Sequence, residues 1–137
     1  MALIKNKSIV SLSENEIFVF GSNLSGIHGA GAAEYALQHF GAVLWEGEGL
    51  MGQSYALPTK RANVYDTCSL EEISGAIERL CQTARQNPQL RFYLTRIGQG
   101  YAGLKESVIR PLIEKAMLPS NVIPWWVWEN TDGEYNA

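Results

Sequence analysis

An apolar run that passes into a glycine-rich turn and then into a helix occurs twice in this chain, and this order is the strongest constraint on its fold. Each apolar run has the length of a buried strand, and each helix has apolar residues at helical spacing. Strands that alternate with helices are typical of an α/β domain with a largely parallel sheet. The expected strands and helices of these two units cover residues 17–20, 29–40, 90–97 and 105–117.

A longer helix is expected to begin near Ser69 and to end at the Asn87-Pro88 pair. Ser69 and Glu72 have the spacing of a capping box, in which each side chain satisfies a backbone N–H at the helix start. The remaining expected elements are strands over 42–45, 54–57 and 122–128, a loop over 46–53, and a polar, frayed tail from about residue 130.

The composition is that of one globular domain that spans residues 1–137. A hydrophobic content of 46% excludes intrinsic disorder, and a net charge of −3 disfavours general binding to a nucleic-acid backbone. The sequence shows neither a signal peptide nor an apolar run long enough to cross a membrane, so we expect a soluble, cytoplasmic protein without a membrane partner. Cys68 and Cys81 make neither a disulfide framework nor a zinc site, and we expect no metal and no cofactor.

The first glycine-rich turn opens a helix with Gly29, Ala30 and Gly31, small residues that let a ligand approach the backbone. Their N–H groups and the helix N-terminus predict an anion site. The alternative is a helix start that needs small residues for packing alone. His28 precedes this turn and is a candidate either for a hydrogen bond to a ligand or for a capping role.

The second glycine-rich turn has the glycine spacing of the dinucleotide fingerprint, but no acid follows about 20 residues later, at Asn121. We interpret this turn as a nest of backbone N–H donors around a phosphate. Two such turns at the carboxyl ends of parallel strands predict a diphosphate held between them. Arg96 lies beside the second turn, where it can pair with a phosphate or with a surface carboxylate. The turn consists of Gly98, Gln99, Gly100, Tyr101, Ala102 and Gly103.

The order of these motifs resembles that of the macrodomain family, from about residue 16 to about residue 128. The matching features are Asn23 after a buried strand, the two glycine-rich turns, and residues 55–61 on the middle strand. Within the family the chain is most similar to the terminal ADP-ribose glycohydrolase type, which includes DNA ADP-ribosyl hydrolases of antitoxin systems. The resemblance implies a three-layer α/β/α sandwich, with a mixed, largely parallel sheet, that binds ADP-ribose or a derivative of it.

The resemblance also implies roles for individual residues. Glu16 would contact the adenine amino group, Asn23 would lie beside the distal ribose, and Lys60 would attack that ribose. The glycohydrolase type has an acid in its second phosphate loop, where this chain has Ala102. Because proton transfer requires such a group, Asp66 is the candidate for the missing catalytic carboxylate.

Two further segments have open alternatives. The loop over 46–53 is either a flexible surface loop or a ligand lid, in which case Glu46 or Glu48 would supply the acid. The tryptophans at 125, 126 and 128 either pack in the core, stack on an adenine, or form an exposed patch that makes a homodimer.

These observations lead to two related functions. One is an enzyme that removes ADP-ribose from a macromolecule through Lys60, and the other is a module that binds or sequesters the nucleotide without turnover. A protein that binds an NAD-type dinucleotide and a small interaction protein with a tryptophan surface are the alternatives. The expected partners are an ADP-ribose-type small molecule and an ADP-ribosylated macromolecule.

Overall fold

The computed structural model describes residues 1–135 and contains a five-stranded sheet with helices on both faces. The sheet has the order β4-β5-β3-β6-β7. Strands β5, β3, β6 and β7 run parallel to one another, and the edge strand β4 is antiparallel to β5. The expected mixed, largely parallel sheet is therefore confirmed. The strands are β3 (Glu16–Asn23), β4 (Gly49–Met51), β5 (Ser54–Lys60), β6 (Arg91–Leu94) and β7 (Val122–Pro124).

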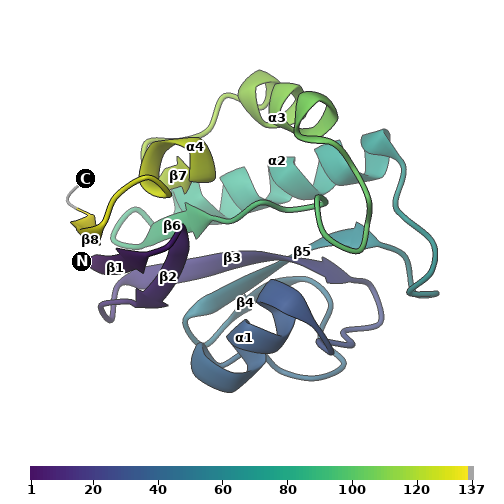
Figure 1. Cartoon of the computed structure of the whole chain (residues 1–137). Helices are drawn as coiled ribbons and strands as arrows, with labels where there is room; N and C mark the ends of the chain where they lie inside the picture. The colour runs from purple at the N-terminus through teal and green to yellow at the C-terminus, as the bar shows by residue number, and fades with distance from the viewer. Residues whose placement is uncertain (136–137) are drawn as a thin grey trace.

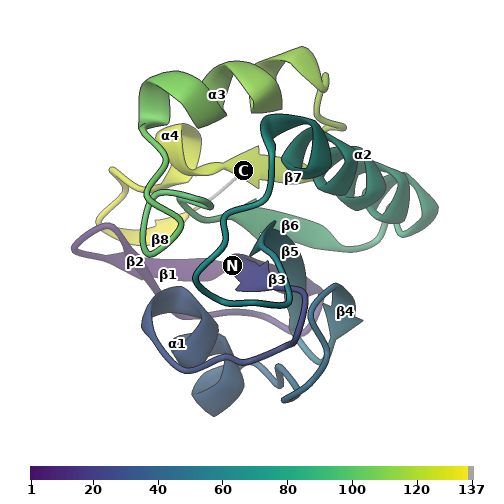
Figure 2. The same cartoon turned by 90° about the vertical axis from the view of Figure 1, so that its right-hand side faces the viewer.

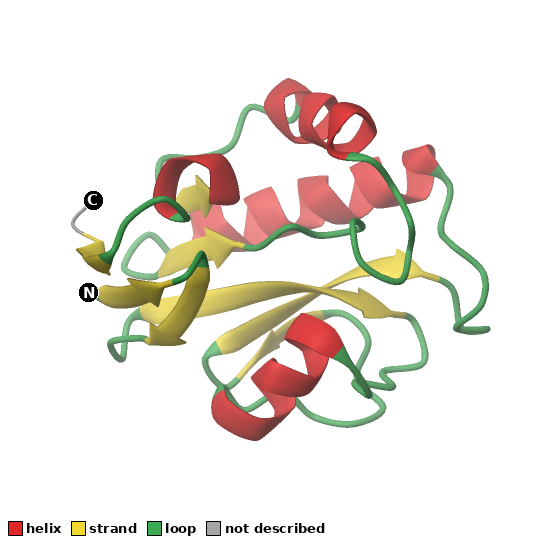
Figure 3. Cartoon of the chain, viewed as in Figure 1, coloured by secondary structure: helices red, strands yellow, loops and turns green. Residues whose placement is uncertain are grey.

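The helices form the two outer layers of the sandwich. Helix α1 (Gly31–His39) covers one face of the sheet, and α2 (Leu70–Gln86) and α3 (Glu106–Lys115) cover the other (Figures 1 and 2). On the α1 side Phe18 of β3 packs against Phe40 and Tyr35, with ring centroids 5.0 and 6.0 Å away. The structure thus confirms the three-layer α/β/α arrangement. Figure 3 shows the same layers coloured by secondary structure.

Helix α2 begins where the capping box predicts. The Glu72 N–H donates to Ser69 Oγ at 3.1 Å, and the Ser69 N–H donates to Glu72 Oε1 at 2.9 Å. Two of the N–H groups that a helix start leaves without partners are satisfied in this way. The buried face of α2, which includes Ile73, Ile77 and Leu80, packs against the sheet, and the helix ends at Asn87.

A second, three-stranded sheet was not expected from the sequence. It has the order β2-β1-β8 and is antiparallel throughout. Its last strand contradicts the expected frayed tail from residue 130, because three residues of that tail pair with β1. Residues 136 and 137 of the expected tail lie outside the described part of the chain. The strands are β1 (Ala2–Lys5), β2 (Ser8–Ser11) and β8 (Gly133–Tyr135).

The expected strand over 42–45 is wrong. Val43, Leu44 and Trp45 are exposed, and residues 44–45 form a turn. The apolar residues at 42–45 predicted a buried strand, but three of these four side chains are exposed in the fold. The short strand β4 lies instead inside the segment expected to be a loop, where it pairs with β5.

The expected strand over 122–128 is also wrong in its second half. Strand β7 ends at Pro124, which is the N-cap of the short helix α4 (Trp125–Trp128). Residues three apart share a helix face, so Trp125 and Trp128 are both buried, and the Trp128 indole N–H donates to the Leu94 carbonyl at 3.1 Å. Trp126 is half-buried, with the Arg110 guanidinium 4.3 Å from its ring centroid. Two of the three tryptophans thus belong to the core, which leaves no tryptophan patch of the expected kind.

No helix among the described residues is long and apolar enough to cross a bilayer.

Candidate functional site

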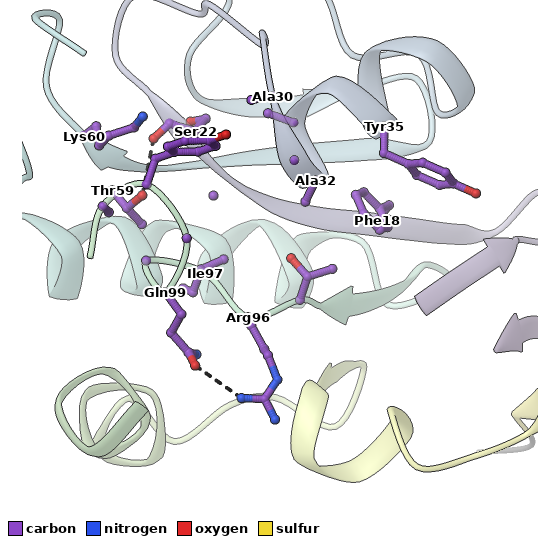
Figure 4. Close-up of a pocket in the computed structure, with 18 of the residues that line it drawn as sticks. Phe18, Ser22, Ala30, Ala32, Tyr35, Thr59, Lys60, Arg96, Ile97 and Gln99 are labelled. Atoms are coloured by element: carbon purple, nitrogen blue, oxygen red, sulfur yellow. Dashed lines mark hydrogen bonds between the residues drawn. The ribbon is translucent and has the colours of Figure 1, made fainter. Parts of the chain in front are cut away.

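A cavity of about 950 Å³ lies at the edge of the sheet where β3, β5 and β6 end. The carboxyl ends of parallel strands meet at one edge, and ligands of open α/β sheets bind there. Figure 4 shows Lys60 and Ser22 at one end of the cavity, and Phe18 and Tyr35 at the other. The volume falls within the range of small-molecule and cofactor sites.

The first wall of the cavity is the turn that opens α1. Its N-cap residue, Ala30, makes no side-chain hydrogen bond to the helix, so the first N–H groups of α1 keep no capping partner. Gly31 has φ +59°, and a Cβ built on it would meet no atom within 4 Å. The small residues at this turn therefore border open space, which argues against packing as their reason.

The second wall is the turn between β6 and α3. Two backbone hydrogen bonds close it, from Gly103 N–H to the Gly100 carbonyl at 3.0 Å and from Leu104 N–H to the Gly98 carbonyl at 2.8 Å. A Cβ built on Gly100 would also meet no atom within 4 Å. Gly21 of β3 lets this turn lie close against the strand, because a Cβ there would lie 3.4 Å from the Gly98 nitrogen.

Asn23 lines the cavity, but its side chain holds the following turn. Its Nδ2 donates to the Ile27 carbonyl at 2.7 Å, and its Oδ1 accepts from the Ile27 N–H and the Ser25 hydroxyl, each at 2.9 Å. This leaves one N–H of the amide for a ligand. The primary role that the structure shows for Asn23 is to shape the chain between β3 and the first glycine turn.

Lys60, at the end of β5, lines the cavity and is half-buried. Its Nζ lies 5.4 Å from the ring centroid of Tyr101, within the range of a cation–π contact. The Thr67 hydroxyl donates to the Ala102 carbonyl at 2.9 Å and ties the segment after β5 to the second glycine turn. Lys60 therefore lies beside that turn.

The structure does not bring Asp66 to the cavity. Asp66 is exposed and its backbone closes the turn after β5, with its carbonyl accepting from Arg61 N–H at 2.8 Å. Among the described residues Glu129 is the one acidic side chain in the cavity lining. The sequence reasoning missed Glu129, which lies between the expected strand over 122–128 and the expected polar tail.

Arg96 lines the cavity and is bound by carboxylates. Its Nε donates to Glu129 Oε2 at 2.9 Å, its Nη2 donates to Glu129 Oε1, and its Nη1 donates to Glu106 Oε1 at 3.1 Å. These hydrogen bonds, the first of them with Glu129, raise the pKa of the Arg96 guanidinium. Figure 4 shows this side chain pointing away from Lys60 and Ser22. The pairing of Arg96 with carboxylates, one of the two sequence alternatives, is therefore present.

Gln99 extends the same network from the second glycine turn. Its Oε1 accepts from Arg96 Nη1 at 3.2 Å, and its buried Nε2 has no partner among the described residues. A Gln99 side chain that is held by Arg96 fixes the position of the turn that carries it.

Glu16 lies outside the cavity lining, at the amino end of β3 and so at the opposite end of the strand from the glycine turns. Its Oε2 accepts from the Tyr93 hydroxyl at 2.7 Å and its Oε1 from the Ser13 N–H at 2.7 Å. Burial raises the pKa of Glu16, but these hydrogen bonds and the nearby N-terminal amine outweigh burial and lower it overall. Burial and the bond to Glu16 raise the pKa of Tyr93 to about 12.

His28 is buried behind the first glycine turn and is not part of the cavity lining. Its Nε2 lies 3.0 Å from both the Val43 and the Glu46 carbonyls, so that nitrogen carries a proton and donates. Its Nδ1 has no partner in the described part of the chain. His28 thus joins the turn that precedes α1 to residues 43–46.

The segment expected as a lid is fastened to the body of the protein. Besides the contacts of His28, the Ser22 hydroxyl donates to the Gly47 carbonyl at 2.5 Å, and Arg79 binds Glu48 with Nε–Oε2 at 2.6 Å. Neither Glu46 nor Glu48 lines the cavity. The lid that would supply an acid is therefore not what the structure shows.

The sequence reasoning missed much of the lining. The turn and strand over residues 7–10 form one wall because the N-terminal hairpin folds beside α1, where the Tyr35 hydroxyl contacts the Val10 carbonyl. Only the residue types at 5–8, a short polar turn between apolar residues, gave a signal for this hairpin.

The two cysteines lie outside the cavity lining. Burial raises the pKa of both thiols, Cys68 and Cys81. No cluster of three His, Cys, Asp or Glu side chains suited to a metal occurs within residues 1–135.

Comparison with known proteins shows similarity of fold at low sequence identity. A macrodomain protein from Streptomyces coelicolor matches with a TM-score of 0.54 and 15% identity, over 89% of this chain and 95% of that one. A crystal structure of a protein from Bacteroides thetaiotaomicron matches with a TM-score of 0.55 and 13% identity, over 89% and 97%. No family model and no curated protein sequence matches the chain. The chain therefore has a fold similar to that of a macrodomain, with the cavity at the carboxyl edge of its sheet.

Proposed function

We propose that the protein binds ADP-ribose or a related nucleotide in the cavity, with the diphosphate between the two glycine turns. The observation that carries this proposal is the open space beside Gly31 and Gly100, where a Cβ would meet no protein atom. Gly100 has no positive φ and its Cβ would touch no protein atom, so a ligand that approaches the backbone closely explains a glycine there, whereas the φ of +59° at Gly31 favours glycine in any case. The uncapped start of α1 adds N–H donors that favour an anion.

The rest of the cavity suits the two ends of such a ligand. Phe18 and Tyr35 supply an apolar, aromatic end for a purine ring. Lys60 supplies positive charge at the other end, where the distal ribose would lie beside Tyr101. The placement of Asn23 next to this end agrees with one remaining amide N–H directed to a ribose hydroxyl.

Binding without turnover is the form of this function that the contacts favour. A lysine that attacks the distal ribose needs a partner for proton transfer. Glu129, the acid found in the described lining, is bound by Arg96, and Ala102 stands where an acid was expected. Hydrolysis of an ADP-ribosyl linkage through Lys60 remains the second candidate, because Lys60 is placed at the cavity beside the Tyr101 phenol.

Calorimetric titration with ADP-ribose, with AMP and NAD as comparison ligands, tests the proposal. We expect micromolar binding of ADP-ribose and at least tenfold weaker binding of AMP, because AMP lacks the second phosphate and the distal ribose. Tighter binding of NAD than of ADP-ribose would favour the alternative of an NAD-type protein. Absence of binding to all three nucleotides would contradict the proposed function.

A further inference from the structure

Residues 43–47 form a turn that is held far more firmly than an ordinary surface loop. Trp45 N–H donates to the Gly26 carbonyl at 2.8 Å, and His28 binds two carbonyls of the same turn. A Cβ on Gly26 would lie 2.3 Å from Glu46 N, and a Cβ on Gly47 would lie 2.4 Å from the Asn23 carbonyl oxygen. Both glycines are therefore required for the backbones of two turns to touch.

The effect of this construction is to present an apolar side chain to solvent. Trp45 is 73% exposed and has φ +74°, a conformation that bulky residues rarely adopt. Its neighbours Val43 and Leu44, and Leu24 and Ile27 on the contacting turn, are exposed as well. Backbone strain that the surroundings enforce is concentrated at functional sites, and exposed apolar patches mark interaction sites.

The position and the charge of this surface indicate what covers it. Ile27 belongs both to the exposed apolar set and to the cavity lining, so the surface continues into the mouth of the cavity. The sequence from Ser8 to Thr59 contains neither lysine nor arginine, whereas Glu46 of the turn is exposed. The cations next to this surface are Arg79, which is bound by Glu48, and Lys60, which lies in the cavity. A polypeptide with apolar and basic side chains therefore complements the exposed Glu46 better than a nucleic-acid backbone would.

We propose that the turn of residues 43–47, with Trp45 at its centre, is a docking surface for the polypeptide that carries the ADP-ribosyl group bound in the cavity. This inference rests on the proposed function. Tryptophan buries a large area at low entropic cost and is enriched among the residues that dominate binding energies. Because the hydrogen bonds already hold the backbone of the turn, a partner does not have to order that backbone on binding.

The test compares four probes: free ADP-ribose, a synthetic peptide with one ADP-ribosyl serine flanked by leucine and arginine, the same peptide flanked by glutamate, and a single-stranded oligonucleotide with one ADP-ribosyl base. We expect the leucine–arginine peptide to bind at least tenfold more tightly than free ADP-ribose, and the other two carriers to show no such gain. We call the ratio of the peptide's affinity to that of free ADP-ribose the gain. Trp45→Asn should abolish this gain and leave the affinity for free ADP-ribose unchanged.

Met117→Asn is the matched control, because Met117 is also apolar, 81% exposed and at positive φ (55°), and lies outside the cavity lining. It should keep the gain. Since asparagine tolerates positive φ, Trp45→Asn should melt no lower than the parent protein. A gain that survives Trp45→Asn, an equal gain for the oligonucleotide, or a dimer that Trp45→Asn dissociates would overturn the inference. Failure of the parent protein to bind free ADP-ribose would instead overturn the proposed function on which it rests.

Discussion

Arg96 Nε lies 2.9 Å from Glu129 Oε2, and a second guanidinium nitrogen of Arg96 binds the other oxygen of the same carboxylate. Glu129 is 6% exposed, whereas the Arg96 side chain is 43% exposed. The pair fixes the start of the second glycine turn against the end of α4. A two-point contact of this kind between an arginine and a buried carboxylate makes Arg96 a positioning residue.

Arg96→Gln is therefore expected to destabilise the protein while leaving the affinity for ADP-ribose within about threefold of the parent. We expect the free energy of unfolding to fall by about 1–2 kcal/mol. This is less than for a fully buried pair, because solvent screens the exposed arginine. Thermal denaturation and calorimetry measure the two effects. Arg85→Gln, at an exposed position in the last turn of α2, is the control with little effect on either. A tenfold loss of affinity at unchanged stability would show that Arg96 contacts the ligand.

Gly100→Val tests whether the second glycine turn binds the diphosphate. A Cβ at this position meets no protein atom and the φ is not positive, but the valine side chain would occupy the space assigned to the diphosphate. We expect at least a tenfold loss of ADP-ribose affinity with a melting temperature unchanged within about 2 °C. Gly75→Ala on α2 is the matched control, and it should raise stability by about 0.5–1 kcal/mol without changing affinity. Unaltered affinity of Gly100→Val would place the ligand elsewhere.

The sequence was sufficient for features that local chemistry decides. The start of α2 follows from Ser69 and Glu72, which are three residues apart, and the glycine turns follow from their own composition. The architecture followed from the alternation of strands and helices. The distinction between strand and helix failed at residues 125–128, because tryptophans three apart and tryptophans two apart are both present in that segment.

Long-range contacts account for most of what the sequence could not predict at the site. The Arg96–Glu129 pair joins residues 33 apart, and Glu129 lies between the expected last strand and the expected tail, where no motif singled it out. Glu16 faces Tyr93 across 77 residues, which no pattern of spacing reveals. The N-terminal hairpin adds a wall to the cavity because its edge happens to lie beside α1. The position of each of these groups depends on the packing of the whole sheet.

Glu16→Gln tests whether Glu16 serves the fold or the ligand. The pKa of Glu16 is lowered in the folded protein, so its contribution to stability is complete above the usual value near 4.5 and is lost as the pH falls through the lowered pKa. Glu16→Gln should be less stable than the parent at pH 7, with the difference shrinking below pH 4.5. Tyr93→Phe should show a smaller difference of the same sign, because one hydrogen bond to the carboxylate is removed.

The measurements for Glu16 are urea denaturation at a series of pH values and calorimetry with ADP-ribose at pH 7. Because Glu16 lies outside the cavity lining, the affinity should stay within about twofold. A large loss of affinity in Glu16→Gln with unchanged stability would support the adenine contact that the family resemblance implies.

Substitutions of Lys60 distinguish a binding module from an enzyme. In a binding module Lys60 contributes positive charge beside Tyr101, so Lys60→Ala should weaken ADP-ribose binding about three- to tenfold at low salt, and Lys60→Arg should largely restore it. In a hydrolase both variants would lose turnover, because an arginine cannot act as an amine nucleophile. Calorimetry at two salt concentrations and release of ADP-ribose from an ADP-ribosylated peptide provide the two readouts. We expect no release by the parent protein, since the acid in the described lining is held by Arg96; release that both substitutions abolish would establish Lys60 as the nucleophile.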